Sequence, residues 1–200
     1  MGTSNIPQDS LRRLIAGNER FVSGEASFAG LRHESLSILA SAQRPFATIL
    51  GCSDSRVPPE LVFDVGLGDL FVIRVAGNVF SPEIAGSLQY AGAHLGTDLF
   101  VVLGHQGCGA ISAALKTRDE GQVQRSRIQV LVERILPSLP EFDPQISQAA
   151  RLMQAVESNV LWTVQQILET PEGRARQGER RLTLVGAIYE IDSGRVRFLT

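Results

Sequence analysis

Short runs of apolar residues alternate along the chain with longer segments in which apolar residues recur at helical spacing. Four runs are short enough for buried strands, at residues 46–50, 70–75, 99–103 and 182–191. The first three are almost continuously apolar, as expected for strands covered by helices on both faces. The pattern therefore predicts an α/β fold with a central, mostly parallel β-sheet of four to five strands flanked by helices.

Helical spacing between these runs predicts helices at residues 82–95, 109–117, 124–136 and 145–168. An earlier helix is expected at 10–22, with Asp9 or Ser10 as its N-cap. The turn residues Asp192, Ser193 and Gly194 predict a hairpin that leads to a final antiparallel edge strand. Loops are expected at residues 1–7, around 23–32 and at 171–178.

Composition favours one globular domain that spans residues 1–200, with 44% hydrophobic and 20% charged residues. The net charge of -2 at pH 7 gives no basic face that would attract nucleic acid or an anionic membrane, so neither is expected as a partner. No window approaches the roughly 18 apolar residues of a membrane span, and the first residues lack a secretory h-region. A cytoplasmic protein is expected.

The two cysteines of the chain both follow predicted strands. Cys52 opens the polar stretch CSDSRVPP, two residues after the first strand. His105 and Cys108 lie in the glycine-rich stretch GHQGCG, directly after the third strand. Ligands of open α/β sheets bind at the carboxyl ends of strands, so these side chains are candidates for one common site.

Thiolate, imidazole and carboxylate groups are the side chains that bind zinc in tetrahedral geometry. Cys52, His105 and Cys108 would supply three ligands, with water or Asp54 in the fourth place. Alternatives are two inert buried thiols, a disulfide between Cys52 and Cys108, or a catalytic cysteine with His105 as its base. A cytoplasmic setting disfavours the disulfide. The polar partner beside each cysteine favours the metal site.

Arg56 follows Asp54 by two residues and can form a bidentate pair with its carboxylate. Held by Arg56, Asp54 would accept a hydrogen bond from a zinc-bound hydroxide; released, it would become the fourth metal ligand. Asp54 and Arg56 are therefore candidate catalytic residues that control access to the metal.

The segments CSDSRVPPE, GDLFVIRVAGN and GHQGCGAI resemble those of the β-class carbonic anhydrases. The patterns C-x-D-x-R, R-x-A-G-N and H-x-x-C occur in the order and at the spacing of that family. The resemblance covers about residues 18–115, with a looser match in the last two strands. It implies one Zn²⁺ per chain on Cys52, His105 and Cys108, gated by Asp54 and Arg56.

The implied activity is the reversible hydration of carbon dioxide to bicarbonate and a proton by a zinc-bound hydroxide. The alternative is hydrolysis of carbonyl sulfide or carbon disulfide on the same scaffold. A catalytically silent zinc protein is disfavoured because both Asp54 and Arg56 are present. A nucleotide-binding module built on Gly66 and Gly68 ranks last, because a third glycine and a downstream acid are missing.

The resemblance also implies a homodimer or tetramer, with the N-terminal helix packed on a partner subunit. It points to substrate-binding residues contributed partly by that neighbour, which here match Gln43, Phe71 and Tyr90, and the amide of Gly109 is a candidate donor to the substrate. Members with a second, regulatory bicarbonate site carry a tryptophan where this chain has Ile49. No such site, and an open zinc near neutral pH, are therefore expected.

Overall fold

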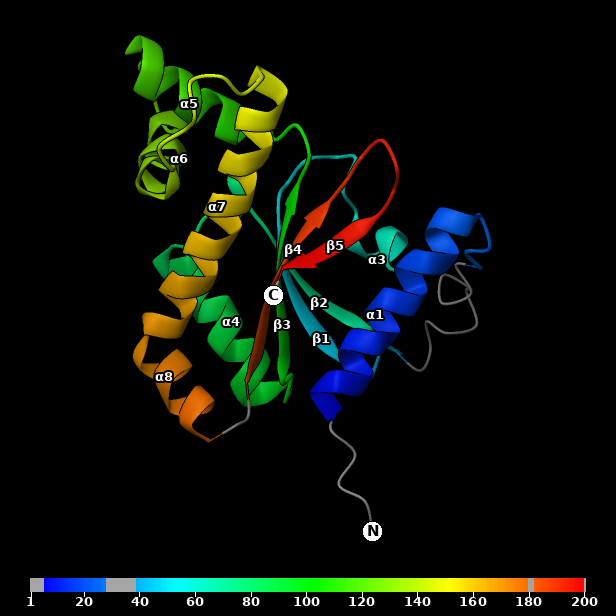
Figure 1. Ribbon diagram of the computed structural model, residues 1–200. Helices are drawn as coiled ribbons and strands as arrows, with labels where there is room; N and C mark the ends of the chain where they lie inside the picture. The colour runs from blue at the N-terminus through cyan, green and yellow to red at the C-terminus, as the bar shows by residue number, and fades with distance from the viewer. Residues whose placement is uncertain (1–5, 28–38, 180–181, 200) are drawn as a thin grey trace.

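Five strands form one sheet in the computed structural model, which describes residues 6–27, 39–179 and 182–199 (Figure 1). The spatial order is β2-β1-β3-β4-β5. The first four strands are parallel, and β5 is antiparallel to β4. The strands are β1 (Ala47–Gly51), β2 (Leu70–Arg74), β3 (Leu99–His105), β4 (Thr183–Tyr189) and β5 (Val196–Leu199).

Helices cover both faces of the sheet (Figure 1). One face carries α1 (Ile6–Ser23) and the short α3 (Pro59–Val62). The other face carries the remaining helices, which include the long α7 in contact with β3 and β4. These are α4 (Pro82–His94), α5 (Gly109–Glu120), α6 (Ile128–Ile135), α7 (Gln148–Glu169) and α8 (Pro171–Gly178), with 3₁₀ turns at Ala76–Asn78 and Leu136–Ser138.

Two hydrophobic clusters lie on opposite faces of the sheet because successive strand residues point to opposite sides. In β1, Ile49 packs toward α1 and α3, whereas Leu50 packs toward α4, α5 and α7. All five residues of β1 and all seven of β3 are buried. No described helix is both long and apolar enough to cross a membrane.

Asn18 of α1 ties this helix to two distant parts of the chain. Its amide nitrogen donates to the carbonyl oxygens of Val62 at 3.1 Å and Gly194 at 2.9 Å. Its amide oxygen accepts from the backbone N–H of Val196 at 2.8 Å. Asn18 is buried, so these bonds satisfy polar groups that water cannot reach.

The predicted fold class is confirmed, including the hairpin to an antiparallel β5. The predicted N-cap of the first helix is wrong, because Asp9 and Ser10 lie inside α1. The predicted loop at 171–178 is also wrong: Pro171 starts α8, and the hydroxyl of Thr170 accepts from the N–H of Gly173 as a helix cap. Of the loops expected at 1–7 and 23–32, residues 6, 7 and 23 belong to α1 instead, and residues 24–27 form neither helix nor strand. The rest of both segments lies outside the described residues.

Replacing Asn18 by alanine should lower the free energy of unfolding by about 2–3 kcal/mol, because one buried carbonyl, one partly buried carbonyl and one partly buried N–H lose their partner. Denaturant unfolding of the Asn18→Ala variant measures this loss. The control is Glu19→Ala, an exposed position one residue along the same helix. Equal stability of the two variants would contradict the role given to Asn18.

Candidate metal centre

The candidate ligands lie at the point of the sheet where the strand order reverses. From β1 the chain adds β2 on one side and then crosses to place β3 on the other. The helices that follow two such neighbouring strands leave on different sides, which opens a crevice at the strand ends. Gly51 of β1 is in register with Leu103 of β3, so Cys52 and His105 emerge side by side.

Cys52, His105 and Cys108 form one buried cluster at this crevice, with ligand atoms within 4.8 Å of one another. Cys52 is 5% exposed, Cys108 1% and His105 0%. Ligand atoms bound to one zinc ion lie about 3.5–4 Å apart, given zinc–ligand bonds of about 2.0–2.3 Å. The three side chains therefore fit a metal ion after small shifts. Both cysteines are free, so the structure does not contain the alternative disulfide.

The imidazole of His105 is oriented as a metal ligand. Its Nδ1 lies 2.9 Å from the carbonyl oxygen of Gln106, which places the ring proton on Nδ1. Nε2 then carries a lone pair, and it is buried without a hydrogen-bond partner of good geometry among the described residues. A second-layer carbonyl that holds the ring in this way is typical of metal-bound histidines.

The two thiols affect each other strongly without a metal. The Cys108 thiol donates to Cys52 and holds the pKa of Cys52 well below its usual range, against the effect of burial. The same bond, with burial, raises the pKa of Cys108. Burial acts to lower the pKa of His105, but its interaction with Cys52 raises it overall. The cluster therefore holds a negative charge that a divalent cation would neutralise.

The turn Ala76–Asn78 supports Cys52 from behind. The N–H of Gly77 lies 3.4 Å from the Cys52 sulfur. Gly77 adopts a φ of 72°, and a side chain there would start 2.8 Å from Ile135, so only glycine fits. Asn159 of α7, 1% exposed, donates to the Gly77 carbonyl at 2.9 Å. The sulfur environment thus depends on a residue of α7, Asn159, which follows Gly77 by 82 residues along the chain.

Asp54 and Arg56 form a bidentate pair beside the cluster. Arg56 donates from Nε to Oδ1 at 2.9 Å and from Nη2 to Oδ2 at 2.8 Å, and its backbone N–H adds a third bond to Oδ1. These bonds hold the pKa of Asp54 well below its usual range. Oδ2 still lies only 3.8 Å from Nε2 of His105. Asp54 is therefore ionised, held by Arg56, and directed at the site.

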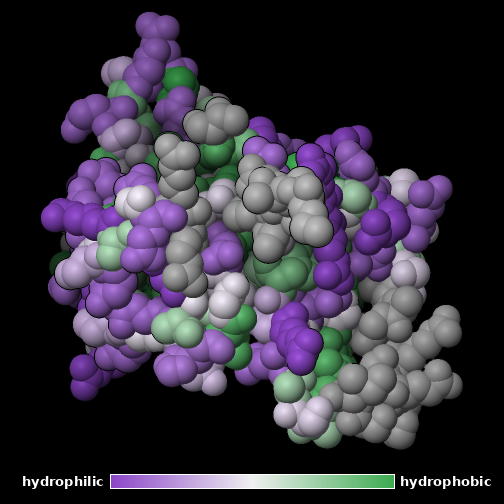
Figure 2. Space-filling view, turned by 90° about the horizontal axis from the view of Figure 1, so that it is seen from below, coloured by the Kyte–Doolittle hydropathy of each residue, from purple (hydrophilic) through white to green (hydrophobic). Residues whose placement is uncertain are grey.

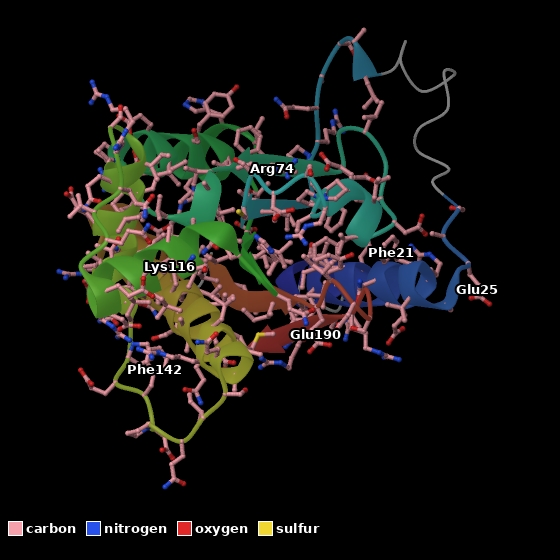
Figure 3. All side chains as sticks on the ribbon, turned by 90° about the horizontal axis from the view of Figure 1, so that it is seen from above. Phe21, Glu25, Arg74, Lys116, Phe142 and Glu190 are labelled. Carbon is pink, nitrogen blue, oxygen red and sulfur yellow. The ribbon has the colours of Figure 1, made fainter. Side chains whose placement is uncertain are left out.

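Arg74, at the end of β2, holds the loop that carries Cys52 and Asp54 (Figure 3). It donates from Nε to the Cys52 carbonyl at 2.9 Å and from Nη2 to the Asp54 carbonyl at 2.5 Å. Figure 3 looks onto this end of the sheet, with Phe21 of α1 and Lys116 of α5 on opposite sides. Arg74 thus fixes the position of both side chains from the neighbouring strand.

The family model described as carbonic anhydrase matches residues 47–196 of the chain. A carbonic anhydrase from Mycolicibacterium smegmatis is 39% identical over 201 residues, with 98% of this chain and 94% of the relative covered. Carbonic anhydrase 2 of Mycobacterium tuberculosis is 36% identical over 190 residues, with 94% and 91% covered. The solved β-carbonic anhydrase CcaA superposes with a TM-score of 0.75 at 27% identity, with 95% of each chain covered.

The chain belongs to the β-class carbonic anhydrases. This family depends on zinc, and Cys52, His105 and Cys108 are positioned to bind the ion. The predictions of family and cofactor are confirmed. The roles of Asp54 and Arg56 stay predictions, as does the absence of a second bicarbonate site at Ile49.

The structure does not bring three of the predicted substrate-binding residues to the metal centre of this β-class chain. Gln43 is exposed and precedes β1, whereas Cys52 follows it. The five residues of this strand separate the two by at least about 16 Å. Phe71 lies three residues before Arg74 in β2, so it is about 10 Å along the strand from the end of the sheet that carries the metal centre. The ring of Tyr90 lies 6.0 Å from that of Phe71, and Tyr90 is 47% exposed. Gly109, by contrast, directly follows Cys108 at the start of α5.

Three supporting contributions were not predicted from the sequence: the Gly77 amide, the Asn159 side chain and the bracing role of Arg74. The R-x-A-G-N segment contains Arg74 and Gly77, so its match to the family pattern indicates a functional role for the segment. The pattern does not indicate which atoms these two residues contact. Asn159 carries no local signal, because it is a single polar residue in an amphipathic helix.

The Cys108→Ala variant should lose zinc and activity together, because it removes one of three ligands from a buried cluster. Zinc per chain, measured by mass spectrometry of the purified protein, tests this. The matched control is Ser112→Ala, one turn further along α5, which should keep one zinc per chain. A Cys108→Ala variant with a full zinc complement would refute the ligand assignment.

Proposed function

We propose that this chain catalyses the reversible hydration of carbon dioxide to bicarbonate and a proton, with Asp54 and Arg56 controlling the metal centre. The observation that carries the proposal is the buried Cys52–His105–Cys108 cluster with an ionised carboxylate beside it. Membership of the carbonic anhydrase family supports the same reaction.

Zinc on these three side chains would lower the pKa of a water molecule and so supply a nucleophile near neutral pH. The residues of the chain then position that nucleophile. Asp54 is ionised and can only accept a hydrogen bond, so it orients the nucleophile toward the carbon of carbon dioxide. Arg56 holds both oxygens of Asp54 and keeps this carboxylate from taking a place on the metal.

The backbone at the start of α5 supports the oxygen that gains negative charge during the reaction. Helix N-termini present free N–H groups and a positive dipole end. The amides of Ala110 and Ile111 already act on the Cys108 sulfur. The amide of Gly109, beside them, is proposed to donate to the substrate oxygen.

We infer that the active enzyme is a homo-oligomer in which the β2 edge of one subunit completes the site of the next. Gln43, Phe71 and Tyr90 lie away from the metal centre of their own chain, and about half of the surface of Tyr90 is exposed. A neighbouring subunit would use these residues to enclose carbon dioxide. The N-terminal helix remains a candidate for contact with the same neighbour, since Ile15 of α1 is 37% exposed.

Residues 1–200 are proposed to act as one domain, because both hydrophobic clusters belong to the same sheet. A cytoplasmic location is proposed because both cysteines must be reduced to bind zinc. Hydrolysis of carbonyl sulfide or carbon disulfide would use the same centre, and no described residue favours it over carbon dioxide hydration.

Stopped-flow carbon dioxide hydration on the zinc-loaded protein should show fast turnover already near pH 7. Asp54→Ala should keep zinc but lose most turnover, about 100-fold, because the nucleophile loses its orienting acceptor. Glu19→Ala, an exposed acid on α1, is the control.

Turnover that begins only above about pH 8 would mean that Asp54 binds the metal at neutral pH. Zinc without carbon dioxide turnover, together with carbonyl sulfide hydrolysis, would favour the alternative.

Subunit mixing tests the shared site. Gln43→Ala and Cys108→Ala should each impair activity, and the two variants co-expressed should regain turnover. A mixed dimer contains one site with an intact metal cluster from one chain and an intact Gln43 from the other. Activity of the mixture that only equals the sum of the separate variants would show that Gln43 does not serve the neighbouring site.

A further inference from the structure

An apolar pocket of about 100 Å³ lies at the end of the sheet opposite the metal centre. Phe100 is the second residue of β3, and Leu182 directly precedes β4, so the pocket lies where the parallel strands begin. Leu88 of α4 and Ile167 of α7 complete its apolar floor. Figure 2 shows this end of the molecule, where the described surface is mostly hydrophilic with small hydrophobic patches.

Among the described residues that line this pocket, Arg176 on α8 is the one with a positive charge. Glu172 lies one helical turn earlier at the exposed rim, but it forms no ion pair with Arg176 in the described part of the chain. Nη1 of Arg176 is instead buried and has no hydrogen-bond partner among the described residues. A buried donor without an acceptor is destabilising, so a carboxylate that approaches this guanidinium and draws Nη1 into a hydrogen bond is favoured.

The position of this guanidinium depends on Gly92 of α4. A Cβ atom at position 92 would lie 2.5 Å from Cζ of Arg176 and 2.7 Å from both terminal nitrogens. A larger residue at position 92 would displace the guanidinium, so glycine leaves the space that Arg176 occupies against α4. The charge therefore lies at the pocket through the packing of α8 on α4.

We propose that this pocket binds a small monocarboxylate with a short apolar chain. The guanidinium fork matches a carboxylate in geometry and charge. The apolar lining offers little to a sugar or a nucleotide but suits a hydrocarbon chain. A cavity of about 150 Å³ accommodates benzene, so the smaller volume here limits the chain to about three or four carbons.

Butyrate is the probe for this proposal, and the zinc-loaded, full-length protein with labelled leucine and isoleucine methyl groups is the sample. Titration with butyrate should shift the NMR signals of Leu88, Ile167 and Leu182, with a dissociation constant on the order of 1 mM for so small a ligand. Butanol and butylammonium, which keep the chain but lack the carboxylate, should bind at least about tenfold more weakly.

Two pairs of variants locate the site. Arg176→Gln should weaken butyrate binding about tenfold or more, whereas Arg174→Gln, exposed on the same helix, should leave it unchanged. Ala85→Leu fills the pocket from α4 and should abolish binding. Its control is Gly86→Ala, whose added Cβ meets nothing within 4 Å. If Arg176→Gln fails to fold, the Ala85 pair and the butanol comparison still decide.

Carboxylates also bind metals, so the titration must distinguish binding at the pocket from binding at the metal centre, at the opposite end of the sheet. Shifts confined to Leu50 and Leu103, which lie next to the metal ligands, would place butyrate at the metal centre and overturn the proposal. Equal affinity for butanol, or binding unaffected by both Arg176→Gln and Ala85→Leu, would overturn it as well.

Discussion

The structure depends on the parallel pairing of β1 with β3. Four register pairs, from Thr48 with Phe100 to Gly51 with Leu103, fix where the two strands end relative to each other. Cys52 directly follows β1 and His105 is the last residue of β3, so backbone hydrogen bonds between two fully buried strands determine how close sulfur and imidazole lie. Cys108 then joins them through the tight turn into α5. A zinc site built in this way has little freedom to distort.

The groups around the ligands share the work of preparing the site before a metal arrives. Arg74 holds the loop by its carbonyls, Arg56 neutralises Asp54, and Gly77 donates to the Cys52 sulfur. Each comes from a different element, and each acts on a different atom. Preorganised donors of this kind favour one charge distribution without the reorganisation that water would need.

The sequence predicted the strands to within two residues at most ends, because buried parallel strands are short apolar runs that end in polar turns. It also predicted that Cys52, His105 and Cys108 come together, because the carboxyl ends of adjacent parallel strands meet at one edge of the sheet. The sequence predicts a loop in place of α8 because the arginine-rich composition of this segment resembles a solvated loop. The local signal for the helix is its cap, formed by Thr170 and Pro171. Long-range contacts such as that of Asn159 with Gly77 do not affect the hydrophobic periodicity of the sequence, so this pattern does not predict them. In the proposed oligomer Gln43 and Tyr90 act on a second chain, and the contacts between chains are not encoded in a local pattern of one sequence.

The bond from Asn159 to the Gly77 carbonyl has a consequence for protein design. A designer who grafted Cys52, His105 and Cys108 onto another parallel sheet would copy the ligands but lose the turn that donates to the sulfur. That turn needs a glycine in a left-handed conformation and a buried amide from a helix on the far side of it. The smallest portable unit of this metal site is therefore two strands, one turn and part of α7, and not a set of three side chains.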